Sequence, residues 1–283
     1  MITLLLLLHI DFGRSLTLHF STRLMFALDF PYVAHLRNQS VLKAKFCTFT
    51  LSVKISGGIQ RDTQLLWSMR LKEFDSRKPV LESCVSSVQQ WYARRRLQCH
   101  MQLNEDKSEL IWFASRFMLK KLTAKDTTMT VGSAIIKPAE SVRNIAVILD
   151  SQLTMQAHIT KVASSCFFHL RRLRQLRHVV AQDVRQRLVL ALVLSRVDYC
   201  NSSLAGLPAI ARAPLQKVLN AATRYVANLR PRDCVKSVQR SLHWLPIHQR
   251  IQYKLCILMY GAAHGYAPDY IYINNLATLT SAT

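Results

Sequence analysis

The stretch SVRNIAVILDSQLTMQAHITKVASSCFFHLRRL (Ser141–Leu173) contains the point at which the pattern of apolar residues changes. Val142–Leu149 contains mostly apolar residues over the length of a strand, interrupted by Arg143 and Asn144, and Asp150 follows it. Beyond Asp150 the apolar residues recur every three or four positions, which is the period of a helix. The sequence therefore predicts that an α+β region gives way to a helical region near Asp150.

The helical pattern continues through residues 151–283, where four helices are predicted. Asp183 stands near the start of the second, where a carboxylate favours the helix dipole. Short loops at Gly206-Leu207-Pro208 and Leu245-Pro246 separate the later helices. The expected structure is a helical bundle with basic outer faces. The four predicted apolar faces are Ile159, Val162, Cys166, Leu170 and Leu173; Val184, Leu188, Ala191, Leu192 and Ser195; Leu215, Val218, Leu219, Ala222, Val226 and Leu229; and Ile251, Leu255, Leu258 and Met259.

Upstream of Asp150, residues 58–150 are predicted to form an α+β region. Apolar residues at helical spacing predict a helix that begins near Pro79. Three strands are expected after it, at Glu109–Ala114, Met129–Ile136 and Val142–Leu149, and the last two are joined by a turn at Pro138-Ala139-Glu140. Residues 1–57 are left unassigned, apart from a strand pair in the mixed apolar and cationic run 41–55.

The charge of the chain is strongly positive and unevenly distributed. Lys and Arg number 38 against 16 Asp and Glu, which gives a formal net charge of +22. Residues 151–283 hold 17 of these cations but only 4 of the acids. This balance excludes a strongly acidic partner mimic and indicates a polyanionic partner, first RNA or DNA and second an anionic membrane surface. Any such surface is expected in the helical region.

The remaining composition excludes several other classes of protein. Seven Gly and eight Pro are too few for a Gly-looped nucleotide enzyme or a turn-rich β-sandwich. Seven Cys without C-x-x-C spacing favour reduced, intracellular thiols over a disulfide scaffold or a zinc ribbon. The apolar segment Met1–Ile10 is much shorter than the ~20 residues of a membrane span, and no Lys or Arg precedes its leucines as in a signal peptide. We therefore expect an intracellular protein, nuclear or cytoplasmic, without a signal peptide.

The main candidate for a binding surface is a group of arginines in the first two predicted helices. Positions 171, 174 and 178 project to one side of the first helix, whereas Leu170 and Leu173 project to the core. Such a stripe can follow a phosphate backbone by releasing counterions, and the alternative is an ordinary solvated helix face. The candidate residues are Arg171, Arg172, Arg174, Arg177, Arg185 and Arg187.

Other chemistry-bearing residues are assigned packing roles. Cys234, His243 and His248 have a ligand-like spacing but lack a fourth ligand for zinc. Ser195 lies within a predicted helix and outside any G-x-S-x-G motif, so it is not expected to be a nucleophile. Cys200 has no activating His nearby in the sequence and is interpreted as a structural thiol.

Five strings together resemble one protein family. In order and spacing they are similar to the C-terminal part of the reverse transcriptase of non-LTR retrotransposons, LINE elements of the jockey-like and chicken-repeat type. The resemblance runs from about Asp62 to about Tyr270, roughly three quarters of the chain, and implies a polymerase palm followed by a helical thumb. The strings are LQCHMQLNEDKSEL (Leu97–Leu110), SVRNIAVILDSQLTMQAHI (Ser141–Ile159), LVLSRVDYCNSSLAGLP (Leu192–Pro208), LQKVLNAATRYV (Leu215–Val226) and LHWLPIHQRIQYKLCILMY (Leu242–Tyr260).

The catalytic motif implied by this resemblance is damaged. In the family a hairpin with a sequence like Y-A-D-D-T-Q-L precedes the helix, and Ile59–Leu65 matches it here. Asp62 keeps the second carboxylate of the pair, but Arg61 replaces the first, so attraction for Mg²⁺ becomes repulsion. Residues 1–57 contain only Asp11 and Asp29 as acids, neither in a convincing strand. The resemblance therefore implies an ancestral Mg²⁺-dependent DNA synthesis on RNA, and the departures predict an inactive remnant that uses no cofactor.

Two further positions, Lys107 and Ala146, correspond to positions of the family. Lys107 matches a Lys that is similar to the general acid near the leaving pyrophosphate, although a surface Lys in a charged turn is the favoured interpretation without the metal carboxylates. Ala146 stands where the family usually has Gly, at what we interpret as a strand position. Such lesions are typical of a decayed genomic copy. The alternatives are a non-catalytic nucleic-acid-binding module and a translated fossil without a function.

Overall fold

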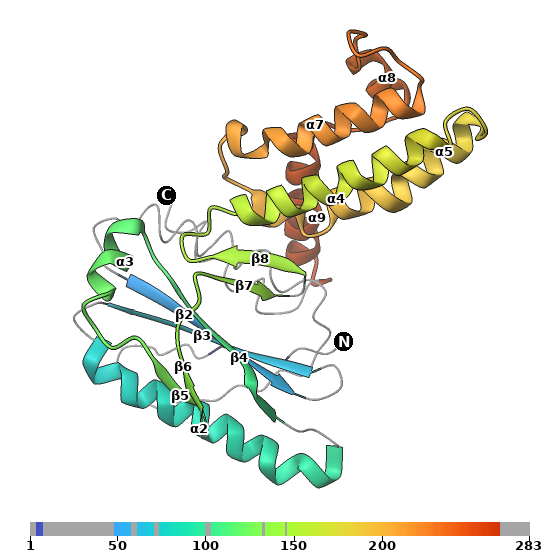
Figure 1. Ribbon diagram of the computed structural model, residues 1–283. Coiled ribbons are helices and arrows are strands. Elements are labelled where there is room, and N and C mark those ends of the chain that lie inside the picture. The colour runs from blue at the N-terminus through green and yellow to red at the C-terminus, as the bar shows by residue number, and fades with distance from the viewer. Residues whose placement is uncertain are drawn as a thin grey trace. The chain divides into compact units, whose positions relative to one another are not determined.

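A computed structural model describes residues 4–7, 48–57, 61–70, 74–99, 103–131, 134–144 and 146–266 of the chain. Strands predominate before Leu153 and helices after it (Figure 1). The chain divides between Leu153 and Thr154 into two units, here called the sheet unit and the helical unit. The fold is thus α+β, and the predicted fold class is confirmed. Among the described residues, no helix is long and apolar enough to cross a membrane.

The sheet unit contains a four-stranded sheet in the order β1-β3-β2-β4. β2 and β3 form an antiparallel hairpin in which Gly57 lies opposite Arg61, and β4 pairs antiparallel with the other edge of β2. The strand pair expected in residues 41–55 is wrong for the described part, because 48–57 is a single strand whose partner is β3; residues 41–47 lie outside the described residues. The strands are β1 (Leu4–Leu7), β2 (Thr48–Gly57), β3 (Arg61–Arg70) and β4 (Leu103–Phe113).

Helix α2 (Phe74–Cys99) contacts β3 and β4 of this sheet. It begins five residues before the predicted start at Pro79. The reason is Phe74, which is buried and packs against Trp112 of β4 with 5.4 Å between the ring centroids. Asp75 in the first turn favours the helix dipole. A buried aromatic anchor therefore fixes the start of α2 ahead of the proline.

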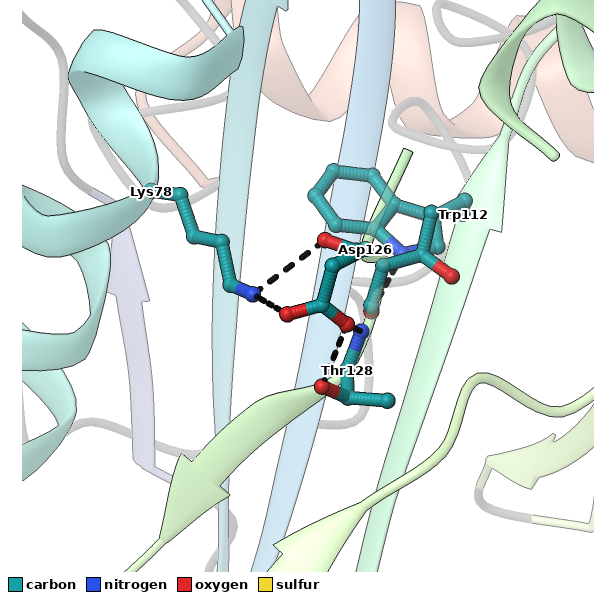
Figure 2. A network of polar contacts seen from close by, with 5 residues as sticks. Lys78, Trp112, Asp126 and Thr128 are labelled. Atoms are coloured by element: carbon teal, nitrogen blue, oxygen red, sulfur yellow. Dashed lines mark hydrogen bonds and ion pairs between the residues drawn. The ribbon is translucent and has the colours of Figure 1, made fainter. Parts of the chain in front are cut away.

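A polar network joins α2 to the loop before β5 (Met129–Val131) (Figure 2). Lys78 Nζ lies 2.5 Å from Asp126 Oδ2 and also donates to the Asp126 carbonyl at 3.2 Å. Thr128 donates its backbone N–H and its hydroxyl to Asp126 Oδ1, at 3.1 and 2.6 Å. Trp112 Nε1 donates to the Thr127 carbonyl at 3.3 Å. The Asp126 carboxylate thus holds both the helix and its own loop.

Asp126 is expected to make the sheet unit sensitive to acid. The hydrogen bond from Lys78, followed by those from Thr128, lowers the pKa of the Asp126 carboxyl from 3.8 to about 2. Because the folded-state pKa is the lower one, the stabilisation is complete above the unfolded pKa and is lost as the pH falls from about 4 towards 2. Urea denaturation at several pH values should show this loss in the wild type and a flatter profile in Asp126→Asn. Glu82→Gln on α2 is the control, and an Asp126→Asn profile as steep as the wild type would contradict the assignment.

Two small hairpins replace two predicted strands. Residues Met129–Ile136 form β5 and β6 (Ala134–Ile136), and the run Val142–Leu149 is divided between β7 (Ser141–Asn144) and β8 (Val147–Asp150). Both single-strand predictions are wrong, because each run reverses direction at its middle. In the second run the reversal includes Ala146, whose φ of 65° lies in the left-handed region. Ala146 is therefore a turn residue rather than a strand residue. Helix α3 (Arg116–Leu122), which follows β4, was not predicted.

Replacing Ala146 by glycine is expected to stabilise the protein. An L-residue with a side chain is strained at positive φ, whereas glycine adopts this conformation without strain. The gain should be about 0.5–1 kcal/mol, reduced in part by the greater freedom of glycine in the unfolded chain. Urea denaturation of Ala146→Gly and of the wild type measures it. Ala146→Val, which carries a β-branched side chain at the same φ, should instead destabilise the protein, and the opposite order would disprove the turn assignment.

In the helical unit, the longest helices lie side by side. α4 packs along α7, and α7 also contacts α5 and α9 (Figure 1). The predicted core faces of the first and third helices are confirmed, except that Val162 is half-buried and Leu229 lies beyond the end of α7. The elements are α4 (Gln156–Gln175), α5 (Gln182–Val189), the π segment η2 (Leu190–Leu194), α6 (Ser195–Asp198), the 3₁₀ turn η3 (Asn201–Leu204), α7 (Ala209–Val226), α8 (Lys236–Ser241) and α9 (Ile247–Ala263).

The predicted face of the second helix is wrong, and that of the fourth is only partly right. In the second, Val184 is 40% exposed and Ala191 and Ser195 are exposed, while the buried residues are Val189, Val193, Leu194 and Val197. The wider π turn changes the register within the run, so a regular 3.6-residue period does not describe it. In the fourth helix, Ile251 is buried, Leu255 and Leu258 are half-buried and Met259 is 42% exposed.

The π segment is stabilised by side chains that bind its carbonyl groups. Ser195 Oγ donates to the Ala191 carbonyl at 2.5 Å, and Arg196 Nε donates to the Leu192 carbonyl at 3.2 Å. From α4, Cys166 Sγ lies 3.7 Å from the Val193 carbonyl, and burial raises the pKa of its thiol to about 11. The Ser195 hydroxyl and the Cys166 thiol therefore both bind backbone carbonyl groups of the π segment.

Candidate nucleic-acid interface

The exposed cations at the end of α4 form the candidate surface. Arg171, Arg172 and Arg174 are exposed, whereas Leu170 and Leu173 on the same turns are buried. Within the described residues none of the three arginines has an ion pair. The helix therefore presents its apolar side to the core and its guanidinium groups to solvent, as the sequence predicts. We call these three residues the α4 arginine cluster.

The described acids of the helical unit all have partners outside this cluster. Asp183 lies 3.9 Å from Arg187 within α5, and Asp198 accepts from Arg250 at 2.6 Å. Asp233 accepts from the backbone N–H of Arg230 at 2.7 Å. Their negative charges are thus committed elsewhere, and the positive charge of the α4 arginine cluster is not neutralised by them. A phosphate backbone provides the opposite charge that this surface lacks.

An exposed aromatic ring lies within the α4 arginine cluster. The Arg172 guanidinium lies over the Phe168 ring at 5.5 Å, and the ring is 47% exposed. His169 meets the Phe168 ring edge-on, 5.5 Å between centroids. Burial, and then the charges of Arg196 and Arg172, lowers the pKa of His169, which favours its neutral form. In proteins that bind single strands, unpaired bases stack on aromatic rings that lie beside cations.

The other three candidate arginines are more constrained. Arg177 is half-buried, and its carbonyl accepts from Arg185 Nη1 at 3.5 Å. Arg185 also lies near Tyr225 of α7, where burial raises the pKa of the phenol and the positive charge of Arg185 partly opposes that rise. Arg187 is exposed but faces Asp183. Arg185 thus links α5 to the segment after α4, and the accessible part of the predicted stripe is the α4 arginine cluster.

The two predicted polymerase positions belong to the same end of the sheet. Asp62 is the second residue of β3 and pairs with Ser56 of β2, which pairs on its other side with Asn104 of β4. Lys107 follows Asn104 in a part of β4 where the register shifts between Lys54 and Ser56 of β2. Neighbouring strands lie about 4.8 Å apart, so the backbones of Asp62 and Asn104 are separated by about two strand spacings.

The hairpin that contains Asp62 lacks the carboxylate pair of a two-metal site. Such a site needs several carboxylates to hold two Mg²⁺ ions. Within the described hairpin β2–β3, Asp62 is the only acid, and Arg61 precedes it. The upstream strand that pairs with β3 is β1, whose four residues are all leucine. We therefore derive no catalytic step through a metal.

The ligand-like residues of the helical unit are dispersed. Cys234, His243 and His248 are all exposed, and no group of three or more His, Cys, Asp or Glu side chains in the described part of the chain is placed to hold a metal ion. Cys200 is half-buried with a positive φ, at the turn before η3. Trp244, in the segment that joins α8 to α9, is buried.

A polar ladder on α7, which the sequence pattern did not predict, joins this helix to α8 and α9. Gln239 Nε2 of α8 donates to Asn220 Oδ1 at 3.1 Å and to Thr223 Oγ1 at 3.2 Å. Gln216 Nε2 donates to the same Asn220 oxygen at 3.0 Å, and its Oε1 accepts from the backbone N–H of Ile247 at 3.1 Å. The signal in the sequence was the helical spacing of three polar residues, at positions 216, 220 and 223.

Comparison of the chain with protein-family models, with curated proteins and with solved structures finds no match in any of the three. A functional proposal for this chain therefore depends on the sequence strings and on the geometry of the described residues.

Proposed function

We propose that the chain is the remnant of an RNA-directed DNA polymerase of the LINE type and that it no longer polymerises. The observation that supports this origin is the backbone register at one end of the sheet. The string that resembles the catalytic motif includes the start of β3, and Asp62 and Asn104 pair with the same residue of β2. The proposed loss of activity rests on the motif itself, because Arg61 replaces one carboxylate of the pair and puts a positive charge where the metals need a negative one.

Primer extension tests this proposal. The purified full chain is incubated with an RNA template, a DNA primer, nucleotides and either Mg²⁺ or Mn²⁺. We expect no extension above a reaction without protein. Extension that disappears in Asp62→Ala would overturn the claim of inactivity. Arg61→Asp, which restores the missing carboxylate, is the informative second variant, because metal binding gained by it supports the proposed origin even without turnover.

A second function is favoured by the α4 arginine cluster: the helical unit binds RNA or DNA without catalysis. Three exposed guanidinium groups without acid partners, next to a half-exposed Phe168, provide electrostatic attraction and a surface for stacking. Neither feature distinguishes one base sequence from another. The proposed activity is therefore binding with little sequence preference, in the nucleus or the cytoplasm.

Fluorescence anisotropy with the full chain measures this activity. Single-stranded RNA, single-stranded DNA and duplex DNA are titrated at several salt concentrations. We expect binding to the single strands that weakens steeply with salt and differs little between unrelated sequences. No binding at low salt would exclude this function and would leave a translated fossil as the interpretation.

A further inference from the structure

A cavity of about 420 Å³ lies between the part of α7 that runs from Ala209 to Asn220 and the start of α9. It is distinct from the α4 arginine cluster, which contributes none of its lining residues. Its walls combine an apolar part, to which Ala209, Ala213 and Ile247 contribute, with a basic and amide-bearing part. The polar lining residues are Arg212, Gln216, Lys217, Asn220 and His248, and the described lining contains no acid.

One of the cations at this cavity has an unmet hydrogen bond. Arg212 Nε is buried and has no hydrogen-bond partner within the described residues. Lys217 is exposed and likewise has no acid partner there. The described lining of the cavity thus carries the positive charges of Arg212 and Lys217 and has no acid to balance them.

The start of α9, where Ile247 and His248 line the cavity, also has backbone N–H groups without an acceptor in the described part of the chain. The Ile247 N–H is bonded to Gln216 Oε1, and Arg250 N–H returns to the Pro246 carbonyl. Between them, the N–H groups of His248 and Gln249 have no acceptor among the described residues. The 17-residue helix adds its positive dipole end at the same place. Free amides at a helix N-terminus beside cationic side chains are an arrangement that binds phosphate.

We propose that this cavity binds a phosphate monoester, whose phosphate lies between Arg212, Lys217 and the first turn of α9. The volume exceeds that of a phosphate alone and is in the range of small-molecule sites, so the apolar wall receives the rest of the ligand. The ligand is either a free nucleoside monophosphate or the 5′-phosphorylated end of a strand. This inference does not rest on the α4 arginine cluster or on a polymerase origin.

Isothermal titration calorimetry of the full chain tests the proposal with adenosine monophosphate, with adenosine, and with a short oligonucleotide that does or does not carry a 5′-phosphate. We expect the phosphorylated member of at least one pair to bind at least tenfold more tightly than its unphosphorylated counterpart, and the pair concerned identifies the source of the phosphate. If the phosphate makes no difference in either pair, the proposal is wrong.

Variants locate the binding. Lys217→Gln and His248→Gln change exposed residues and leave the Gln216–Asn220–Gln239 bonds in place, so both should fold. Lys217→Gln should weaken phosphate-dependent binding about tenfold, the lower end for a hydrogen bond to a charged group. Lys254→Gln, which removes an exposed cation of α9 outside the cavity, should bind like the wild type. Equal binding by Lys217→Gln and the wild type would overturn the site. Neutralising the α4 arginine cluster should leave this binding unchanged, which separates the two surfaces.

Discussion

Replacing Arg171, Arg172 and Arg174 by glutamine is expected to reduce the affinity for single-stranded RNA on the order of 100-fold at low salt. Glutamine preserves the helix propensity of the position and removes its charge. Each phosphate that is no longer neutralised should lower the slope of log K against log salt by about 0.7, so the slope should fall by about two. The reduction should be similar for unrelated sequences, because interactions with the phosphate backbone do not read bases.

A control variant with the same change in charge tests whether position matters. Lys236, Arg240 and Lys254 are exposed cations of α8 and α9, and each is replaced by glutamine in the control. If binding depended only on the net charge of the chain, the two triple variants would weaken it equally. We expect the control to keep most of the affinity and the slope of the wild type. Equal behaviour of the cluster variant and the wild type would exclude the α4 arginine cluster as the interface.

The second large effect is expected in the core, at the residue beside this cluster. Leu170 is 1% exposed on the face of α4 that contributes to the core. Leu170→Ala removes buried methyl groups and leaves a cavity, which should lower the free energy of unfolding by about 2–5 kcal/mol. Urea denaturation followed by circular dichroism measures the change.

Leu176→Ala is the matched control for this experiment. It makes the same substitution one residue beyond the end of α4, where the side chain is 47% exposed. Its effect should stay within about 0.5 kcal/mol, as is usual for exposed positions. If the two variants were destabilised alike, the inward orientation of Leu170 would be wrong, and with it the outward orientation inferred for Arg171.

The helices that the sequence predicts best are those with a single apolar stripe. α4 and α7 bury the residues that recur at 3.6-residue spacing, because the opposite sides of both helices are polar. The run Leu188–Leu194 is apolar on every side, so its sequence cannot select the buried face. Packing against α4 and α7 and the π turn make that choice instead, which is why the predicted face was wrong.

Strands were harder to delimit than helices. β2 alternates apolar and polar residues through Phe49, Leu51, Val53 and Ile55, a period-2 signal that was present in the sequence. The turn at Ala146 has no such signal, since neither Asn-Gly nor Asp-Gly marks the reversal within the apolar run. An alanine at positive φ is recognised only once the backbone is known.

The two candidate sites also differ in how far the sequence alone could predict them. The α4 arginine cluster is contiguous in the sequence, so its charge and helical spacing could be predicted directly. The cavity between α7 and α9 combines Arg212 and Lys217 with His248, which is more than 30 residues further along the chain. Those residues meet because the fold brings the start of α9 against α7, where the Ile247 N–H is bonded to Gln216. The pattern of a single sequence does not indicate which residues of two separate helices come together in space.

The structure around the π segment depends on the number of residues that the segment contains. A π turn is what a helix forms when it accommodates one residue more than α-helical geometry allows. Deleting one residue from Leu190–Leu194 would restore regular hydrogen bonding and rotate the following residues by about 100° about the helix axis. Asp198 would then turn away from Arg250, the partner that it contacts at 2.6 Å. The contact between the second helix of the bundle and α9 thus depends on the number of residues in this turn as well as on their identity.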